Sequence, residues 1–142
     1  MTIHKKGQAH WEGDLKRGKG TVSTESGVLN QQPYGFNTRF EGAKGTNPEE
    51  LIAAAHASCF SMALSLMLSE AGFTATSIDT EATVSLDQVS GGFSITKVAL
   101  QSKIAVPDID ADTFDGIIQK AKAGCPVSQV LKAEITLDYQ LN

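Results

Sequence analysis

The longest apolar run of the chain, Asn47 to Gly72 (NPEELIAAAHASCFSMALSLMLSEAG), predicts one long helix. Asn47 is a good N-cap, and Pro48 falls at the first helical position, where its missing N–H leaves no bond unmade. Glu50 is placed to complete a capping box. Gly72 tolerates the left-handed backbone that ends many helices. The sequence therefore predicts a helix that begins at Asn47 or Pro48 and ends just before Gly72.

This helix is expected to lie in a protein core. No formal charge stands between Glu50 and Glu70, so we expect almost its whole circumference to be buried. About 20 apolar residues would also cross a membrane. Serines and His56 interrupt the run and no basic flank follows it, so we favour a core helix over a membrane span. Small residues recur three or four apart along one face, which lets another backbone approach closely: Ala54, Ser58, Ser61, Ser65 and Ser69.

Length and composition indicate one ordinary globular domain. The chain has 142 residues, 41% hydrophobic and 20% charged, and no linker, repeat or low-complexity segment divides it, so we expect a single domain over residues 1–142. The net charge is −4 and basic residues are scattered, which disfavours nucleic acid and membrane surfaces as partners. The N-terminus has basic residues but no apolar stretch after them, so no signal peptide is expected. These features favour a cytoplasmic protein.

Short strands are predicted on both sides of the long helix. Residues 7–31 hold three runs separated by glycine-rich or charged turns, which predicts an antiparallel meander of QAHWEG, GTVSTES and GVLNQQ. Phe36 to Glu41 is expected to be short and extended. After the long helix the apolar period becomes two, which predicts a half-exposed strand and a return strand over Phe93 to Val106. The apolar phase of the return strand shifts, so we expect a bulge near Lys97.

The remaining segment predicts two helices and a final strand. Apolar residues from Phe114 to Gly124 have helical spacing, and Cys125-Pro126 begin a further short helix. Alternating apolar residues from Ile135 to Leu141 predict a last strand that completes a sheet. Because hairpin turns rather than helical crossovers join the predicted strand pairs, the sequence predicts an α+β fold rather than a parallel α/β fold.

The two cysteines carry the most reactive chemistry of the chain. Cys59 lies in the middle of the long helix, where burial raises the pKa of a thiol and leaves it inert unless a positive charge or a donor offsets the desolvation. Cys125 lies at the N-terminus of a predicted helix, where the dipole favours a thiolate. In a reducing compartment such cysteines are working thiols or inert buried residues more often than a permanent disulfide. The residues alone leave both interpretations open.

His56 lies one turn before Cys59, which raises the alternative of a Cys/His nucleophilic pair, as in a thiol protease or acyltransferase. A mid-helix cysteine has no free backbone N–H groups around it to bind an oxyanion, because the helix uses them. We therefore interpret His56 as structural. The histidines and cysteines show no CxxC or HxxxH spacing, so we expect no metal site.

Two segments carry a specific resemblance to a known family. The run TNPEELIAAAHASCFSMAL, followed much later by CPVSQVLKAEITLDYQL, resembles the OsmC/Ohr family of osmotically inducible and organic hydroperoxide resistance proteins, and its OsmC branch more than its Ohr branch. The resemblance extends from GQAHWEGDLKRGKGTVST through PYGFNTRFEG to the C-terminus. It implies an OsmC-like fold with antiparallel sheets around a long buried central helix, assembled as an intertwined two-fold homodimer.

The resemblance also implies an activity in oxidative and osmotic stress defence. It is that of a thiol peroxidase, which reduces organic hydroperoxides to alcohols, and hydrogen peroxide less well, with no cofactor. Cys59 matches the peroxidatic cysteine, Cys125 the resolving cysteine and Glu49 the family's glutamate. The implied cycle passes through a Cys59 sulfenic acid and a Cys59–Cys125 disulfide, which an external dithiol or lipoyl-type reductant reduces.

An arginine is expected beside the reactive thiol. The Ohr branch carries it in a segment where this chain has Arg17, and the OsmC branch in a segment where it has Arg39; we favour Arg39 and keep Arg17 as the alternative. A planar, permanently charged guanidinium can hold Cys59 as a thiolate while it pairs with a carboxylate, for which Glu49 is the candidate. We therefore expect the pKa of Cys59 to lie well below the free-thiol value of about 8.5.

Helix geometry separates two of these residues. Glu49 and Cys59 are ten residues apart on one predicted helix, which places them about 15 Å apart at 1.5 Å per residue. Leu51 to Ala57 contains no Gly or Pro that would break the helix. We therefore expect Glu49, and with it Arg39, to serve the Cys59 of a second chain in a dimer whose long helices pack through the small-residue face.

A second class of function stays open at this stage. A non-catalytic stress-response module, or one that binds a small hydrophobic ligand, would need an apolar pocket but not two thiols that meet. A peroxidase needs both features. Titration of the thiols before and after one equivalent of cumene hydroperoxide separates the two classes, because the enzyme would lose two thiols per chain and the module none.

Overall fold

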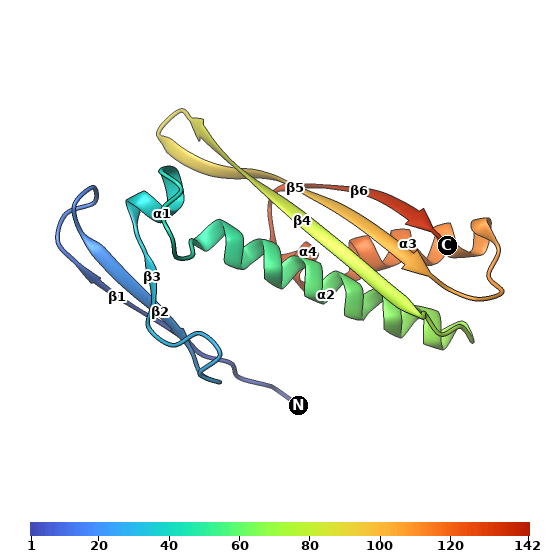
Figure 1. Cartoon of the computed structure of the whole chain (residues 1–142). Coiled ribbons are helices and arrows are strands. Elements are labelled where there is room, and N and C mark those ends of the chain that lie inside the picture. The colour runs from blue at the N-terminus through green and yellow to red at the C-terminus, as the bar shows by residue number, and fades with distance from the viewer. The chain divides into compact units, whose positions relative to one another are not determined.

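The computed structural model describes all of residues 1–142 and divides into two compact units, residues 1–51 and 52–142, which are described separately. Helices and strands are combined as the sequence predicts, which confirms the α+β class; the single domain stays a prediction. Figure 1 shows the elements, which are β1 (Gly7–Glu12), β2 (Lys19–Thr24), β3 (Gln32–Tyr34), α1 (Phe36–Phe40), α2 (Pro48–Glu70), β4 (Ser77–Val89), β5 (Gly92–Ala105), α3 (Ala111–Gly124), α4 (Pro126–Val130) and β6 (Glu134–Leu141).

The first unit holds an antiparallel sheet in the order β1-β2-β3, which confirms the predicted meander. Its third strand begins later than predicted, because the chain loops out after β2. The N–H of Thr24 donates to the carbonyl of Leu29 at 2.9 Å, and Gln31 has a positive φ of 50°. The predicted strand GVLNQQ is therefore wrong except for its last residue.

The segment predicted to be extended, Phe36 to Glu41, is wrong as well, because it forms the short helix α1. Local hydrogen bonds close its turn: the buried Thr38 hydroxyl accepts the N–H of Gly35 at 2.8 Å, and the N–H of Arg39 donates to the Gly35 carbonyl at 3.1 Å. Its two phenylalanine rings lie 4.8 Å apart, one helical turn from each other. The helix places Arg39 in its last turn.

The ends of α2 agree closely with the predicted helix. Asn47 caps it, since its side chain accepts the N–H of Glu50 at 2.8 Å. The Glu50 carboxylate does not complete a capping box but accepts the Thr46 hydroxyl at 2.8 Å. Gly72, with φ of 89°, follows the helix as expected. The start and stop signals of the sequence thus fix this element.

Burial of α2 is narrower than predicted. Phe60, Leu64 and Leu68 are fully buried along one stripe, whereas Met62 and Leu66 are 75% and 59% exposed, so the expectation of burial around almost the whole circumference is wrong for the single chain. By length and composition α2 is apolar enough to cross a membrane. Its buried stripe, however, belongs to the hydrophobic core of the second unit, which supports the interpretation as a core helix.

The second unit contains the sheet β4-β5-β6. β4 and β5 form a long antiparallel hairpin whose register shifts between Ser85 and Leu86, opposite Lys97 and Ile95, which confirms the bulge predicted near Lys97. β6 pairs with β5 in parallel, so this sheet is mixed, whereas the expected sheets were antiparallel. The reason is the connection: α3 and α4 carry the chain back before β6 begins, as a parallel pair requires.

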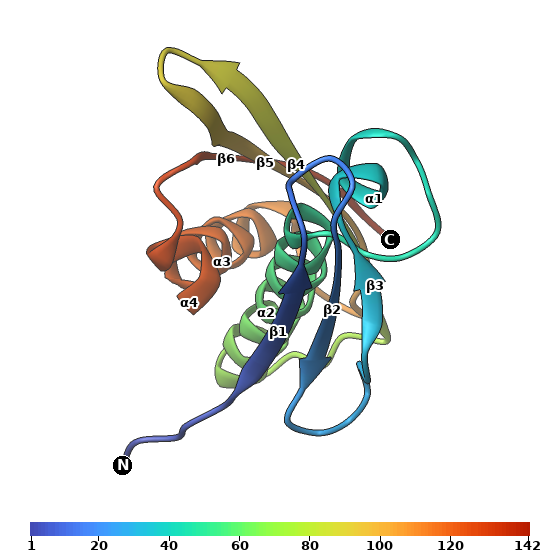
Figure 2. The same cartoon turned by 90° about the vertical axis from the view of Figure 1, so that its left-hand side faces the viewer.

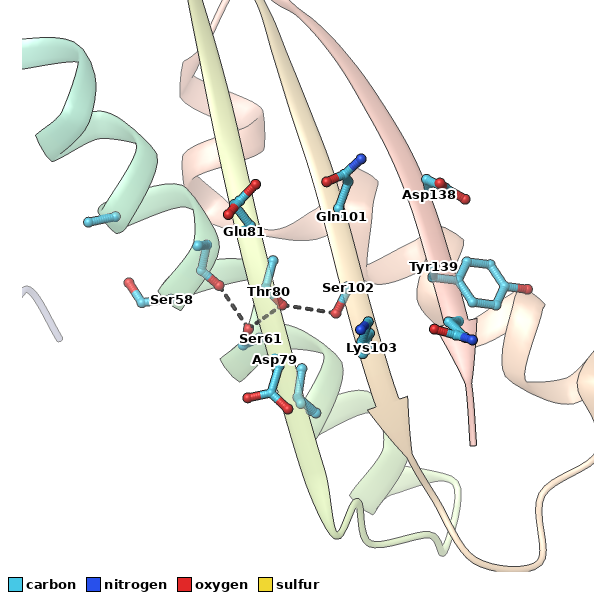
Figure 3. A pocket seen from close by; sticks show the side chains of 14 residues that line it. Ser58, Ser61, Asp79, Thr80, Glu81, Gln101, Ser102, Lys103, Asp138 and Tyr139 are labelled. Carbon is cyan, nitrogen blue, oxygen red and sulfur yellow. Dashed lines mark hydrogen bonds between the residues drawn. The ribbon is translucent and has the colours of Figure 1, made fainter.

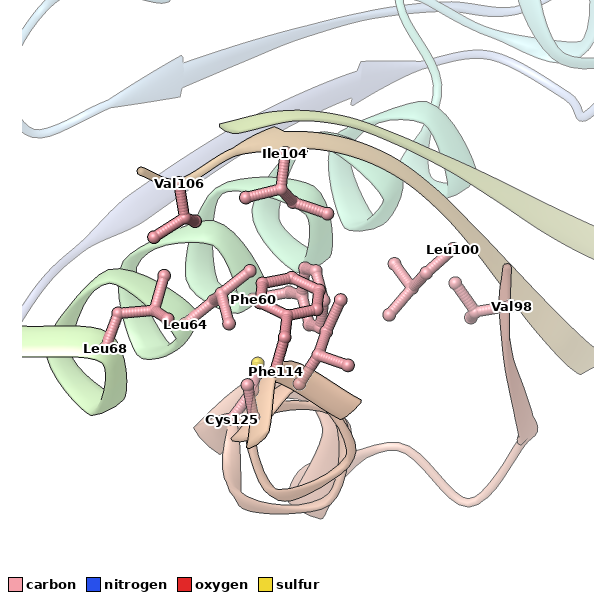
Figure 4. Close-up of a cluster of buried hydrophobic side chains, with 11 residues drawn as sticks. Phe60, Leu64, Leu68, Val98, Leu100, Ile104, Val106, Phe114 and Cys125 are labelled. Carbon is pink, nitrogen blue, oxygen red and sulfur yellow. The ribbon is translucent and has the colours of Figure 1, made fainter. Parts of the chain in front are cut away.

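The core of the second unit lies between this sheet and two helices. Figures 1 and 2 show α2 and α3 on the same face of the sheet, and Figure 4 shows their side chains meeting those of β5. Asp110 caps α3, since its carboxylate accepts the N–H of Thr113 at 2.8 Å. The fully or almost fully buried apolar residues are Phe60, Leu64, Leu68, Val98, Leu100, Ile104, Val106, Phe114, Ile118, Ala121 and Cys125.

Candidate active site

Cys59 and Cys125 meet in the second unit, although they are far apart in the sequence. Cys59 is half-buried in the middle of α2, and Cys125 is fully buried at the junction between α3 and α4. Both thiols are free, and a hydrogen bond joins them. Figure 4 shows the Cys125 sulfur beside the buried apolar cluster. The fold thus places a partly accessible thiol against a buried one.

The surroundings of Cys59 oppose its ionisation. Burial raises the pKa of the thiol, the hydrogen bond with Cys125 raises it further, and the backbone N–H of Val127 lowers it. None of these groups carries a positive charge. The low pKa expected from the sequence is therefore not produced by the residues that surround Cys59 in its own unit.

The role of the Val127 N–H at the start of α4 is the part of this site that the sequence reasoning missed. As one of the first N–H groups of α4 it has no partner within the helix, and its hydrogen bond to Cys59 lowers the pKa of that thiol. A mid-helix cysteine therefore does receive a backbone donor, from another helix. The Cys-Pro dipeptide was the available signal, because Pro at a first helical position leaves free N–H groups after it.

His56 does not pair with a cysteine. Its Nε2 lies 2.7 Å from the hydroxyl of Ser128 on α4, and the ring is fully buried. Burial lowers the pKa of this histidine, which favours the neutral ring. Its Nδ1 is buried with no hydrogen-bond partner. The geometry agrees with a structural histidine and adds Ser128, which sequence reasoning did not single out.

Arg39 and Glu49 form the second predicted pair, and both belong to the first unit. The Arg39 Nε donates to both carboxylate oxygens of Glu49, at 3.0 and 3.1 Å, and Nη2 donates to Oε1. The Glu49 side chain is 10% exposed and that of Arg39 is 34% exposed. The guanidinium also lies 5.5 Å from the ring centroid of Phe40. The predicted pairing of Arg39 with Glu49 is therefore present, and it fixes the plane of the guanidinium.

Arg17, the alternative arginine, has a different environment. It lies in the turn between β1 and β2, its side chain is 89% exposed, and it pairs with Asp14 three residues earlier at 3.0 Å. The same Asp14 also caps the turn by accepting the backbone N–H of Arg17 at 2.7 Å. This contact is local to the turn. The surroundings favour Arg39 as the arginine with a functional role.

The four predicted site residues thus form two pairs, one in each unit. α2 links the units, since it begins beside Glu49 and runs unbroken past Cys59 to Glu70. No group of three His, Cys, Asp or Glu side chains in residues 1–142 is arranged to hold a metal ion. The four residues supply two thiols and one arginine–glutamate ion pair.

A groove of about 1040 Å³ lies along α2 and the strands of the second unit, but it is not at the thiols. Most of the residues that line it are polar, and neither cysteine is among them. Figure 3 shows a chain of hydroxyls within it: Ser61 lies 2.8 Å from Thr80, which lies 2.9 Å from Ser102. These hydroxyls satisfy one another, so we assign no substrate to this groove.

Comparison with known proteins places the chain in a family. The family model described as OsmC-like protein matches residues 41–140. The chain is 87% identical over 141 residues to "Peroxiredoxin OsmC" of Escherichia coli strain K12, with 99% of both chains covered. It is 28% identical over 123 residues to the organic hydroperoxide resistance protein OhrB of Bacillus subtilis strain 168, with 86% of this chain and 88% of OhrB covered.

The solved structures show the same fold. The crystal structure of Bacillus subtilis OhrB superposes with a TM-score of 0.68 at 25% identity, covering 96% of this chain and 98% of OhrB. Both the sequence match and the structural match extend beyond the segment that carries the cysteines. The resemblance inferred from the two cysteine segments is confirmed, and the chain belongs to the OsmC family.

Proposed function

We propose that the chain is a cysteine-based thiol peroxidase that reduces organic hydroperoxides to alcohols, and hydrogen peroxide less well, in oxidative and osmotic stress defence. The observation that carries the proposal is the contact between Cys59, which is partly accessible, and Cys125, which is buried beside it. The 87% identity with a protein named as a peroxiredoxin supports the same reaction class.

In the proposed reaction the Cys59 thiolate attacks the O–O bond of the hydroperoxide. The bond breaks, the alcohol leaves with a proton, and Cys59 becomes a sulfenic acid. Cys125 then condenses with it to form the Cys59–Cys125 disulfide and water. The two electrons that reduce the peroxide come from the two thiols, so an external dithiol must reduce the disulfide after each turnover.

We assign the activation of Cys59 to Arg39. Burial raises the pKa of the thiol, so a nearby positive charge is needed to favour the thiolate at neutral pH. The Arg39 guanidinium is held by Glu49 through hydrogen bonds to both of its oxygens and keeps 34% of its side-chain surface exposed. It is therefore oriented and still available to a second group.

We further propose that this arginine acts across a homodimer. α2 is continuous between Glu49 and Cys59, a rise of about 15 Å, so the pair cannot lie at the Cys59 of its own helix. α2 also exposes a face of small and apolar residues suited to pack against another helix: Ala54, Ser58, Met62, Ser65 and Leu66. A two-fold axis along this face would create two equivalent sites.

Subunit mixing tests the shared site. A Cys59→Ser chain mixed with an Arg39→Ala/Glu49→Ala chain should regain about a quarter of the wild-type activity, because half of the random dimers hold one complete site of two. As a matched control, a chain with all three substitutions is mixed with the wild type. Because a quarter of the random dimers are then wild type, this control should keep about a quarter of the wild-type activity if the sites are shared, and about half if each site lies within one chain. About half in the control and none in the first mixture would place each site within one chain.

The external dithiol is expected to attack Cys59 rather than Cys125, because Cys59 is the accessible sulfur and Cys125 is fully buried. Attack by an aromatic monothiol on the oxidised protein should give a mixed disulfide on Cys59 and a free thiol at Cys125. Alkylation followed by peptide mass spectrometry identifies both. A mixed disulfide on Cys125 would show that the oxidised site exposes the other sulfur.

We propose a cytoplasmic location for the peroxidase, since a reducing compartment keeps both thiols free between turnovers. Cell fractionation should recover the protein with cytoplasmic markers. Recovery in the membrane fraction would count against this location and would favour the membrane-spanning interpretation of α2.

Thiol titration tests the proposed function itself. One equivalent of cumene hydroperoxide per chain should remove two titratable thiols, and a dithiol should restore both. A non-catalytic or ligand-binding module would keep both thiols under the same conditions. Loss of one thiol without formation of a disulfide would mean that one cysteine reacts with the peroxide and that Cys125 does not act as the resolving cysteine.

A further inference from the structure

We propose that His56 and Ser128 are positioning residues for the condensation of the two thiols, an inference that rests on the proposed peroxidase function. The pair bridges α2 and α4, the two helices that carry Cys59 and the residues next to Cys125. Neither side chain touches the reacting sulfur atoms in a hydrogen bond of its own. Their role is to hold α4 where the buried thiol can reach the sulfenic acid.

The bridge runs beside the thiol pair. His56 precedes Cys59 by three residues on α2, and Ser128 follows Cys125 by three residues at the start of α4. The imidazole and hydroxyl lie 2.7 Å apart, and their residues are 0% and 8% exposed. Because three residues are about one helical turn, the contact between His56 and Ser128 and the contact between Cys59 and Cys125 join the same face of α2 to the same face at the start of α4.

α4 needs such a link because it has little stability of its own. It is five residues long, far below the length at which an isolated helix is stable, and its N-cap, Cys125, makes no side-chain capping bond. Val130 at its other end is 79% exposed. The position of α4 therefore depends on its contacts with α3 and α2, and the bond between His56 and Ser128 is a buried polar contact that ties it to α2.

The state of the imidazole supports a specific role. Nδ1 of His56 is buried with no partner, which costs stability that an apolar side chain at this position would not lose. An apolar side chain in place of His56 would fill the same space without leaving a buried polar atom unpaired. What the histidine supplies, and an apolar side chain would not, is the hydrogen bond to Ser128.

The step that depends on this bridge is the second chemical step. The S–S bond forms as the S–O bond of the Cys59 sulfenic acid breaks, and the hydroxyl leaves with the Cys125 proton as water. Disulfide geometry is narrow, with Cα atoms typically 4.4–6.8 Å apart, so a displaced α4 slows this step. Attack on the peroxide requires only Cys59 and is affected less.

Ser128→Ala is the central test, with Ser128→Thr as the variant that restores the hydroxyl. After rapid mixing with one equivalent of cumene hydroperoxide, Ser128→Ala should form the sulfenic acid within threefold of the wild-type rate. Its disulfide should form at least tenfold more slowly, so that dimedone traps the sulfenic acid. Ser128→Thr should recover most of the disulfide rate, and His56→Phe should behave like Ser128→Ala.

Ser102→Ala is the matched control, because Ser102 lies on β5, away from α4, and its buried hydroxyl lies 2.9 Å from that of Thr80 on β4. It should lower stability but keep the wild-type rate of disulfide formation. Equal disulfide rates in Ser128→Ala and the wild type would overturn the positioning role, and so would an equal slowing in Ser102→Ala.

Diamide separates this inference from the proposed function, because it oxidises the two thiols without a peroxide. If the wild type fails to react with cumene hydroperoxide, the peroxidase proposal is wrong. A slower diamide-driven disulfide in Ser128→Ala would still support the positioning of Cys125 by α4. An unchanged diamide rate would overturn it.

Discussion

The two pairs that we propose to carry the chemistry of this chain differ in charge and in burial. Arg39 and Glu49 are charged, oriented by hydrogen bonds from the guanidinium to both carboxylate oxygens, and the guanidinium stays partly in solvent. Cys125 is fully buried, and burial together with the hydrogen bond from Cys125 raises the pKa of Cys59. One pair holds a charge without a nucleophile, and the other holds a nucleophile without a charge.

Neither pair by itself supplies both the nucleophile and the positive charge that the proposed reaction needs. Burial raises the pKa of the Cys59 thiol, so at neutral pH the single unit holds a thiol rather than a thiolate. An exposed thiolate would meet other electrophiles and oxidants, whereas a buried thiol reacts only when a cation is brought to it. In the proposed dimer, association of the two chains brings Arg39 of one chain to Cys59 of the other, so dimer formation also activates the thiol.

The largest expected effect breaks the thiol pair. Cys59→Ser should reduce hydroperoxide turnover by about 1,000-fold or more, because it removes the nucleophile. Cys125→Ser should complete one turnover and then stop, since the sulfenic acid has no thiol to condense with. Stopped-flow measurement of peroxide consumption distinguishes a single burst from none. A normal burst in Cys59→Ser would reverse the roles of the two cysteines.

Breaking the charged pair should have the next largest effect. Arg39→Ala should slow the alkylation of Cys59 by iodoacetamide at pH 7 by about 30-fold, because a rise of one to two units in the pKa of the thiol lowers the thiolate fraction by that order. Arg17→Ala is the matched control and should stay within twofold of the wild type. If Arg17→Ala slows the reaction and Arg39→Ala does not, the alternative arginine carries the role.

Glu49→Gln should produce a smaller loss, because it leaves the charge of Arg39 in place and removes only the carboxylate that orients it. We expect turnover to fall by about tenfold. The alkylation rate should fall less than in Arg39→Ala. If Glu49→Gln and Arg39→Ala lose equal amounts of turnover and of alkylation rate, Glu49 does more than orient the guanidinium.

The sequence predicted the elements whose ends are set by local chemistry. Asn47 and Gly72 bound α2 because a cap and a left-handed glycine act within a few residues. α1 was missed because a hydrogen bond to the Thr38 side chain closes its turn, and the spacing of apolar residues in so short a segment does not predict that bond. The parallel pairing of β6 was missed because strand direction depends on the path of the chain through α3 and α4.

The four predicted residues of the candidate site were found from the sequence, whereas the hydrogen bond between His56 and Ser128 was not. The resemblance to the OsmC/Ohr family singled out Arg39 and Glu49 as well as the pairing of Cys59 with Cys125. Reasoning from the residues added that the Arg39 guanidinium could pair with the Glu49 carboxylate. No local pattern joins two cysteines on different helices. The bridge from His56 to Ser128 depends on the same tertiary packing, so it became visible only when α4 was seen against α2.

The smallest expected effect concerns His56, the uncharged group closest to the thiols in sequence, and it tests whether the thiol region excludes charge. Burial lowers the pKa of His56, so between this pKa and the unfolded value of about 6.5 the unfolded chain binds a proton that the folded chain does not. Stability should therefore fall as the pH drops below about 6.5, by no more than about 1.4 kcal/mol per pH unit from this group. The free energy of unfolding, measured with urea at pH 7.5, 6.5 and 5.5, should fall less steeply with decreasing pH in His56→Gln than in the wild type. His10→Gln, at a side chain that is 69% exposed, is the control and should show the wild-type dependence on pH.

The same dependence on pH in all three proteins would show that the folded state accommodates a charged imidazole at His56. The contrast between a charged and an uncharged region would then not extend to His56.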